Sequence, residues 1–138
     1  MPKITFTVPG KPQGKARPRF CRGHAVTPQK TREYEAAAAL LYRRAARGES
    51  FMNGEALRIC VYAYYPIPAK AKIADTAEMQ RGDLLPLKKP DIDNVVKIIL
   101  DALNGVAYRD DTQVAELHAA KHYSVDPRVI VTLETIGK

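Results

Sequence analysis

The sequence lacks tryptophan and has few of the residues on which several common enzyme chemistries depend. Its two cysteines, Cys21 and Cys60, are too few for a disulfide framework, and we interpret them as free thiols. Ser50 and Ser124 are the only serines, and neither lies in a motif with a plausible base. Acyl transfer through a serine nucleophile therefore has no support.

Histidine is also scarce, and the three that are present form no recognisable metal motif. His118 and His122 have the spacing of a zinc-protease pair but lack the glutamate base, and Cys21 with His24 offers only two soft ligands. The segment 10–15 resembles a phosphate-binding loop, but it is one residue short and lacks the following serine or threonine. We therefore expect ordinary surface or structural roles for the histidines and no nucleotide cofactor.

Long hydrophobic runs are missing as well. No apolar run approaches the length of a membrane span, and the first residues lack the apolar stretch of a signal peptide. At 138 residues the chain is long enough for a core of its own, and we expect one domain over residues 1–138. Its hydrophobic and charged fractions, 46% and 27%, indicate a globular rather than a disordered chain. We expect a cytoplasmic protein with no membrane partner.

Acidic residues are missing from the first part of the chain, where none precedes Glu33. Residues 9–28 are instead rich in proline, glycine and positive charge, which favours a flexible loop over regular structure. The net charge of +7 indicates a polyanionic partner, and the crowded cations of this loop would repel one another unless they met phosphates. A solvated surface loop is the simpler alternative. The cations concerned include Lys11, Lys15, Arg17, Arg19 and Arg22.

Hydrophobic periodicity in the first half of the chain predicts a strand, a helix and a second strand. Residues 3–8 and 57–65 alternate between polar and apolar, as half-buried strands do. Between them, Thr27 and Pro28 have the pattern of a helix cap followed by proline at the first helical position. The helix is predicted to end at Gly48, with a packing stripe formed by Tyr34, Ala38, Leu41 and Ala45.

The second half of the chain completes this pattern. A short helix is possible at 71–79, a longer one is predicted in the central segment, and residues 114–123 are ambiguous between the helical and strand periods. The β-rich run 129–133 favours a closing hairpin. The order of elements predicts a single α+β domain with a mixed or antiparallel sheet and helices packed on one face.

The segment from Lys89 to Gly105 carries the strongest chemical signal in the chain. Pro90 favours an extended conformation, so we expect Asp91 and Asp93 on an extended segment with both carboxylates on one face. Asp93 or Asn94 can then cap a helix that the final glycine ends. The helix is apolar on almost every side except for a polar stripe of Asn94, Lys97, Asp101 and Asn104.

A second pair of carboxylates, Asp110 and Asp111, follows this helix after a short connection. A loop of that length can return the pair toward the helix, so the four acids and Lys97 could converge. Carboxylate oxygens suit Mg²⁺ or Mn²⁺, and a bound ion can polarise a phosphodiester and lower the pKa of a bound water. Lys97 would then stabilise the negative charge that develops on the departing oxygen.

Two parts of the sequence closely resemble the RusA family of Holliday-junction resolvases. The run from Lys89 to Val114 reads Lys-Pro-Asp-x-Asp-Asn-x-x-Lys-x-x-x-Asp-Ala-Leu-Asn-Gly-x-x-x-x-Asp-Asp-x-Gln-Val, and its spacing is that of the family. The opening Pro9-Gly-Lys-Pro-Gln-Gly-Lys-Ala-Arg-Pro-Arg-Phe, followed by Thr27 and by Lys30-Thr31-x-x-Tyr34-Glu35, is similar to the N-terminal pattern of phage-associated members. The likeness covers most of the chain.

The resemblance implies roles for individual residues. Asp91, Asp93 and Asp111 match the family's metal-binding acids, which use Mg²⁺ or Mn²⁺, and Lys97 matches its catalytic lysine. Asp110 matches an acid whose role is not separable from that of Asp111. The matching positions with a supporting part in the site are Asn94 and Asp101.

The resemblance also implies the partners. RusA-like enzymes are homodimers that nick two strands of a four-way junction at symmetric positions during DNA recombination and repair, and a twofold enzyme suits a twofold substrate. Their fold is α+β, in agreement with the elements predicted above. The basic loop 9–28 would grip the DNA backbone, with Lys15, Arg17 and Arg19 as the foremost contacts and Lys11 and Arg22 beside them.

Two other functions stay open from the sequence. A nuclease of broader specificity could cut flaps or replication forks, because branched DNA is recognised by its shape. A non-catalytic DNA-binding protein could instead use its acids for a structural metal. The presence of every predicted ligand and of Lys97 argues against an inactive relative.

Overall fold

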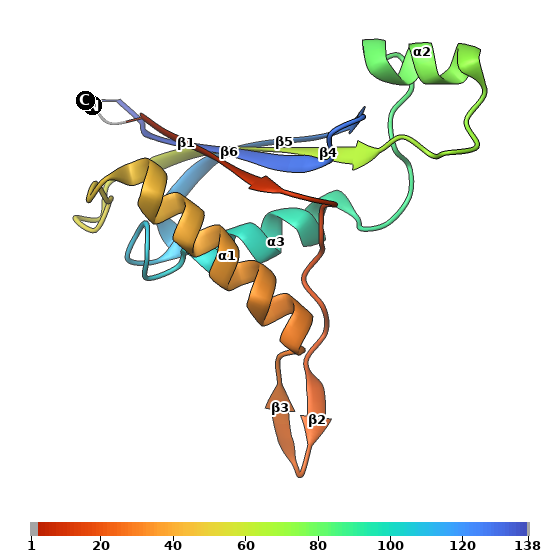
Figure 1. The fold of residues 1–138 in the computed structure, drawn as a ribbon. Helices are drawn as coiled ribbons and strands as arrows, with labels where there is room; N and C mark the ends of the chain where they lie inside the picture. Colours follow the sequence, from red (N-terminus) through yellow and green to blue (C-terminus); the bar gives the residue numbers. More distant parts are fainter. Residues whose placement is uncertain (1–2, 138) are drawn as a thin grey trace.

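The computed structural model describes residues 3–137, except for the side chain of Arg19, and is built on a four-stranded sheet (Figure 1). The strands lie in the order β1, β6, β4, β5; β6 pairs antiparallel with β1 and β4, and β4 pairs parallel with β5. The sheet is therefore mixed, and the predicted strands at 3–8 and 57–65 are confirmed. The bounds are Lys3–Pro9 for β1, Leu57–Pro66 for β4, Val114–Ser124 for β5 and Arg128–Thr135 for β6.

Two helices cover one face of the sheet. Helices α1 (Gln29–Ala46) and α3 (Ile92–Leu103) both lie on the face toward which the alternating apolar residues of β1 and β4 point (Figure 1). Their apolar side chains share one core with the sheet, in which the rings of Phe6 and Tyr42 meet edge to face at 5.9 Å. This common core confirms the α+β class and positions α3 beside the sheet.

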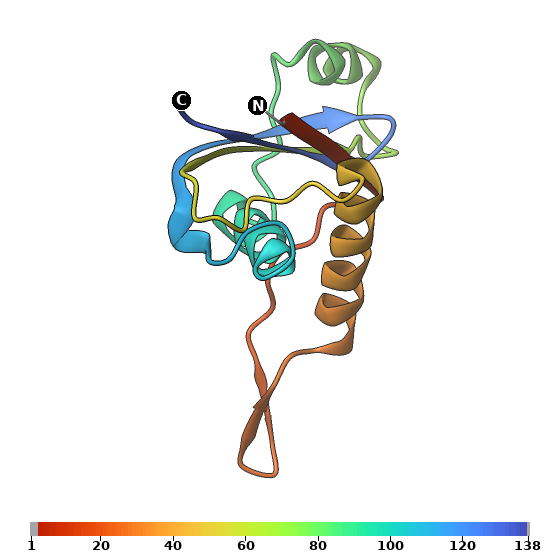
Figure 2. The same cartoon turned by 90° about the vertical axis from the view of Figure 1, so that its left-hand side faces the viewer.

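Helix α2 (Ile73–Arg81) departs from the prediction that the helices pack on one face. It lies on the opposite side of the sheet from α1 and α3 (Figures 1 and 2). Among its described residues none is buried, and Ile73 is 91% exposed. A short polar helix has too little apolar surface to compete for the core face. None of the helices in residues 3–137 combines the length and apolar character needed to cross a membrane.

The basic loop 9–28 is not wholly irregular, contrary to the prediction. Strands β2 (Arg19–Cys21) and β3 (His24–Val26) pair antiparallel as a hairpin that projects away from the body of the molecule (Figures 1 and 2). Arg22 and Gly23 link them with φ angles of 52° and 80°. Positive φ at both central residues is the geometry that matches the twist of a tight hairpin. The turn chemistry of Arg22-Gly23 was the missed signal.

The last two strands do not form the closing hairpin that the sequence favoured. Strand β4 lies between β5 and β6, so the chain crosses β4 when it passes from one to the other. Strand β6 is buried on alternate residues and takes a central place, whereas β5 takes the edge. Alternating burial shows which face of a strand is covered, and the edge strand β1 alternates as β6 does, so the periodicity of residues 129–133 did not distinguish an edge from a central position.

Helix α1 begins and packs slightly differently from the prediction. Pro28 occupies the N-cap position instead of Thr27, so the helix starts at Gln29. Its C-terminal end is confirmed near Gly48, with Arg47 in the left-handed conformation as C-cap. Tyr34 and Ala38 are buried as expected, but the stripe continues through Tyr42 and Ala46 rather than Leu41 and Ala45. The stripe follows the i, i+4 row because that row faces α3 and the sheet.

Candidate active site and nucleic-acid interface

Helix α3 carries most of the candidate site and begins earlier than the sequence indicated. Asp91 occupies the N-cap position (φ −66°, ψ 150°), and Asp93 already lies in the first helical turn. There the Asn94 N–H donates to Asp93 Oδ1 at 3.0 Å. The prediction that Asp91 and Asp93 share one face of an extended segment is therefore wrong. The backbone becomes helical between them, and each helical residue turns by about 100°.

The loop before α3 is tied to the ends of two strands. The Tyr65 hydroxyl at the end of β4 donates to the Pro90 carbonyl, and the Lys121 ammonium of β5 donates to the Lys88 carbonyl at 2.7 Å. Lys121 also lies 4.9 Å from the centre of the Tyr65 ring. Burial, with a contribution from the Asp91 carboxylate, raises the pKa of Tyr65 to about 12. These contacts fix where α3 starts and hence where Asp91 lies.

The narrow polar stripe on α3 is confirmed. The other faces of the helix are buried in the core, whereas Asn94 and Asp101 are half-buried and Lys97 and Asn104 are exposed. The helix ends at Leu103 and is followed by Gly105 with a φ of 78°, as predicted. Residues at spacings of three and four lie on one side of a helix, so the stripe faces a single direction.

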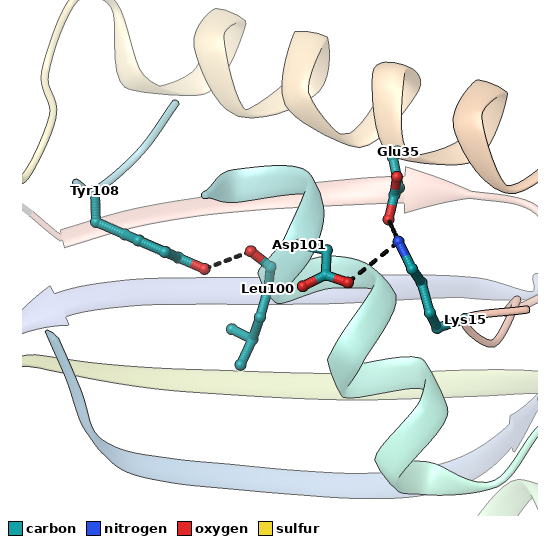
Figure 3. Close-up of polar contacts among 5 residues, drawn as sticks. All are labelled: Lys15, Glu35, Leu100, Asp101 and Tyr108. Atoms are coloured by element: carbon teal, nitrogen blue, oxygen red, sulfur yellow. Dashed lines mark hydrogen bonds and ion pairs between the residues drawn. The ribbon is translucent and has the colours of Figure 1, made fainter. Parts of the chain in front are cut away.

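The basic arm (residues 10–18, between β1 and β2) lies along this stripe and is fixed there by Lys15. The Lys15 ammonium lies 2.7 Å from Glu35 Oε2 of α1 and 3.1 Å from Asp101 Oδ2 of α3 (Figure 3). The Lys15 backbone N–H also donates to the Asn94 carbonyl at 3.0 Å. Burial alone would lower the pKa of Lys15, but hydrogen bonds to both carboxylates raise it above its usual 10.5. A phosphate contact by Lys15 would have to compete with these two carboxylates.

Gly14 allows the arm to approach the start of α3 closely. A Cβ at this position would lie 2.9 Å from the Pro90 Cβ and 3.0 Å from the Asn94 Cβ, closer than carbon atoms normally pack. The arm and α3 enclose two open grooves of about 750 and 360 Å³. The arm groove, the larger of the two, is lined by arm residues 11–17 with Lys30, Lys89, Pro90, Asp91 and Asn94 among others. The α3 groove is lined by Lys15, Ala16, Arg17, Pro18, Asn94, Lys97 and Asp101.

Asp110 and Asp111 are placed by the side chain of Gln113. Asp111–Gln113 form a short 3₁₀ helix, and Gln113 Oε1 accepts from the backbone N–H groups of Arg109 at 2.8 Å and Asp110 at 3.2 Å. Gln113 Nε2 donates to the carbonyls of Phe51 and Glu55, both at 2.9 Å. One amide side chain thus satisfies four backbone groups and fixes the loop that carries both acids.

Tyr108 brings this loop against the second half of α3. Its hydroxyl donates to the Leu100 carbonyl at 2.7 Å (Figure 3). Burial, together with the nearby carboxylates of Asp111, Asp101 and Asp110, raises the pKa of Tyr108 far above its usual range. The returning loop therefore reaches the level of Asp101, as the short connection predicted.

The neighbouring carboxylate of Asp110 affects the pKa of Asp111. A hydrogen bond to Asp110 is the main cause that raises the pKa of Asp111, and burial and the negative charges of Asp110 and Asp101 act in the same direction. Lys97 acts in the opposite direction and lowers it. Like charges held together in this way favour either a shared proton or a bound cation. Lys97 supplies a positive charge near Asp111.

The structure places the acids in two groups along α3. The charges of Asp101, Asp110 and Lys97 all act on the pKa of Asp111, whereas Asp91 and Asp93 lie at the start of the helix. Asp91 and Asp101 are ten residues apart, which is about 15 Å along a helix axis. Within residues 3–137, no three acidic, histidine or cysteine side chains are arranged to hold a metal ion. The hard oxygen donors fit Mg²⁺ or Mn²⁺ chemically, and Asp93 is one helical turn from Lys97.

Four residues that organise the site were not among the predicted site residues. Glu35 and Gln113 stood in the quoted motifs, but neither is a strong acid-base or metal-ligand signal by itself. Tyr65 and Tyr108 looked like ordinary core aromatics. The sequence offered one signal for these four residues, the polar Gln113 two positions after the paired acids. The roles of the other three residues depend on contacts between segments that are distant in the chain.

The arginines of the basic segment differ in how they are placed. Arg17 is exposed in the arm, and Arg22 is exposed at the tip of the hairpin. Lys11 is exposed at the other end of the arm. The side chain of Arg19 lies outside the described part of the chain. Lys11, Arg17 and Lys30 line the arm groove, and exposed cations of this kind give that side of the molecule a surface suited to phosphates.

Most of the chain matches a known protein family and a known relative. Residues 9–134 match the family described as Endodeoxyribonuclease RusA. The chain is also 34% identical over 140 aligned positions to the uncharacterized protein YqaN of Bacillus subtilis (strain 168), with 97% of each chain covered. Both matches span the arm, the hairpin, α3 and the Asp110-Asp111 loop.

Proposed function

The chain belongs to the RusA endodeoxyribonuclease family, and from this membership we propose that it resolves four-way DNA junctions by metal-dependent, paired hydrolysis of phosphodiester bonds. The family is one of endodeoxyribonucleases, so DNA is the expected substrate, and the resolvase activity of RusA proteins makes branched DNA the proposed class. The observation that supports the proposal most strongly is the α3 groove, where Lys97 and Asp101 face the basic arm, together with the contact from Tyr108 to Leu100 that brings the loop of Asp110 and Asp111 against α3.

We propose that the carboxylates of Asp91, Asp93, Asp110 and Asp111 bind divalent metal from two groups along α3, with Asp110 and Asp111 near Lys97 and with Asp91 and Asp93 at the start of the helix. Asp111 is the central member, because its contact with Asp110 creates a concentration of negative charge that a cation would relieve. Asp93 approaches the same region from one helical turn before Lys97. When bound, Mg²⁺ or Mn²⁺ would polarise the scissile phosphodiester and lower the pKa of an attacking water.

Lys97 is proposed to act on the substrate directly. Its ammonium is exposed on the polar stripe, borders the α3 groove and is close enough to Asp111 to affect the pKa of that carboxyl. A fixed positive charge there would stabilise the negative charge that develops on the phosphate and on the departing oxygen. Asn94 and Asp101 support it by positioning the arm, through the Lys15 N–H and the Lys15 ammonium respectively.

The DNA backbone is proposed to follow the basic arm. Arg17 and Arg22 would contact phosphates, with Lys11 and Arg19 along the same path, while Lys15 holds the arm against α1 and α3. A homodimer is proposed because two symmetric nicks in a junction require two sites related by a twofold axis. Sedimentation analysis of the purified protein measures this directly, and a monomer that still makes paired nicks would contradict it.

The first test is cleavage of labelled synthetic DNA. The protein is incubated with a four-way junction, a fork and a linear duplex in Mg²⁺, in Mn²⁺ and in EDTA. We expect paired symmetric nicks in the junction that depend on metal. Equal cutting of all three substrates would support a broader nuclease, and binding without any cutting would support the non-catalytic alternative.

The matched variants are Asp111→Asn, Lys97→Met and the control Asp83→Asn. Asp83 is exposed at the end of α2 on the far side of the sheet, so its variant should cut normally. In EDTA, Asp111→Asn should unfold at a higher temperature than the parent protein, because the repulsion with Asp110 is removed. Mg²⁺ should stabilise the parent but not this variant, and equal stabilisation of both would remove Asp111 from the metal site.

A further inference from the structure

Phe20 is an exposed aromatic side chain on the projecting hairpin. It is 82% exposed, whereas every other phenylalanine and tyrosine in residues 3–137 is buried or half-buried. Its cross-strand partner is Ala25, whose methyl group is too small to cover the ring. The remaining residues of β3 are exposed as well, so the hairpin keeps its aromatic ring in water rather than in the core.

The chain on both sides of Phe20 carries positive charges. Arg17 and Lys30 flank the hairpin on its two sides along the chain and are exposed, and Arg22 occupies its tip. Arg22 adopts a φ of 52°, a conformation that arginine rarely takes, and this places a cation at the end of the hairpin that projects farthest (Figures 1 and 2). No acid precedes Glu33 in the sequence, so the surroundings of the ring complement a polyanion.

We propose that Phe20 is a stacking wedge: it inserts beside a base at the branch point of the DNA while the neighbouring cations hold the phosphates. This inference rests on the proposed function, because it assumes a branched DNA substrate. In a continuous duplex each base is already stacked on both sides, and inserting a ring means unstacking a base step. At a branch point stacking is interrupted or easily opened, so the ring can replace a lost neighbour.

The wedge lies next to the candidate active site. Pro18 lines the α3 groove together with Lys97 and Asp101, and Phe20 follows Pro18 by two residues. Two residues of extended chain span at most about 7 Å, the length of roughly two nucleotides along one strand. A base stacked on Phe20 would therefore hold the strand so that a phosphodiester a few nucleotides away enters the α3 groove. Stacking would select branched DNA and also fix the position of the cut.

The test compares Phe20→Ala, Phe20→Leu and Phe20→Trp, with Ile73→Ala as the control. Ile73 is also an exposed apolar residue but lies on α2, on the other side of the sheet. Binding to a junction and to a linear duplex is measured in EDTA, so that cutting does not interfere. We expect Phe20→Ala to weaken junction binding by about 5- to 150-fold, the range for loss of one stacked base, with duplex binding unchanged. Phe20→Trp should bind the junction about as tightly as the parent protein, and Phe20→Leu should bind it with an affinity between those of the parent and Phe20→Ala.

A fluorescent base analogue at the branch point gives a direct readout of stacking. Its emission should change when the parent protein or Phe20→Trp binds, and should change little with Phe20→Ala at saturating protein. In Mg²⁺, Phe20→Ala should also spread the cut sites over several positions. The thermal unfolding of Phe20→Ala should match that of the parent, since the ring is exposed.

The outcomes separate the wedge from the function on which it rests. Equal losses for junction and duplex, or an unchanged junction affinity, would overturn the wedge while leaving the nuclease intact. A changed sedimentation coefficient in Phe20→Ala would assign the ring to contact with a second copy and would also overturn it. A parent protein that binds junction and duplex equally and cuts neither would instead refute the proposed function.

Discussion

Removing Lys15 should destabilise the protein, because one ammonium group joins the arm to two helices. In Lys15→Met the apolar stem is kept, but Glu35 and Asp101 lose their common cation. The side chains of Glu35 and Asp101 are 19% and 31% exposed, and that of Lys15 is 18% exposed. The burial of this three-residue ion pair is therefore intermediate between that of an exposed pair and that of a buried pair. Exposed pairs contribute up to about 1 kcal/mol and breaking a buried pair costs about 3–5 kcal/mol. We therefore expect a loss of about 2–3 kcal/mol in the free energy of unfolding at pH 7.

The assay is chemical and thermal unfolding of the parent, Lys15→Met and Lys11→Met. Lys11 lies in the same arm but is exposed, so its variant controls for the loss of one positive charge. At roughly 4 °C per kcal/mol for a domain of this size, Tm should fall by about 10 °C in Lys15→Met. In the Lys15→Met background, Glu35→Gln should recover stability because it removes the carboxylate repulsion, whereas in the parent it should reduce stability.

The contribution of Lys15 should also depend on pH in one direction. Because the pKa of Lys15 is raised on folding, the folded protein binds this proton more tightly than the unfolded chain. The stabilisation is then complete below the unfolded value of 10.5 and is lost as the pH rises through the higher folded value. The difference between parent and Lys15→Met should stay constant from neutral pH to about pH 10 and shrink above it. Equal stability of Lys15→Met and Lys11→Met at pH 7 would refute the reasoning.

Four other changes test the remaining contacts. Gly14→Ala should destabilise by about 1–3 kcal/mol in urea unfolding, because its Cβ meets the Pro90 ring at 2.9 Å. Gln113→Leu should cost about 2–4 kcal/mol, since it leaves four backbone groups without their partner, while Gln80→Leu at the exposed end of α2 should unfold like the parent. Tyr65→Phe should cost about 1 kcal/mol by the same measurement, through the lost bond to the Pro90 carbonyl. Arg17→Met should reduce the slope of log affinity for the junction against log salt by about 0.9, and an unchanged slope would remove Arg17 from the phosphate path.

Much of the fold could be predicted because it follows from local periodicity. The alternation of polar and apolar residues at 3–8 and 57–65 predicted two strands. The mostly apolar segment 95–103, with polar residues at spacings of three and four, predicted α3 and its polar stripe. The stop at Gly105 followed from its permissive backbone. These features depend on residues within a few positions of one another, so the sequence carries them directly.

The β2–β3 hairpin was a local turn that the prediction overlooked, whereas the other errors concern choices between distant partners or the fine detail of helix ends. The apolar run at 129–133 is compatible with two arrangements: β6 could pair with β5, or it could enter the sheet between β1 and β4. The choice depends on which faces the distant strands bury. Helix α3 starts at Ile92, directly after a segment whose Pro90 carbonyl accepts from the Tyr65 hydroxyl, 25 positions away in the chain. A contact between residues so far apart leaves no trace in local periodicity.

The chemistry available to this protein could be read from its residues alone: the family motif, the acids, Lys97 and a basic arm free of negative charge. The tertiary structure decided how these groups are used. It turned Lys15 inward between Glu35 and Asp101, brought Asp111 to Lys97 through Tyr108 and Gln113, and left Phe20 exposed on a hairpin beside the α3 groove. The physical reason is that residue types and short-range periodicity are written along the chain, whereas charge pairing and exposure depend on which distant segments pack together.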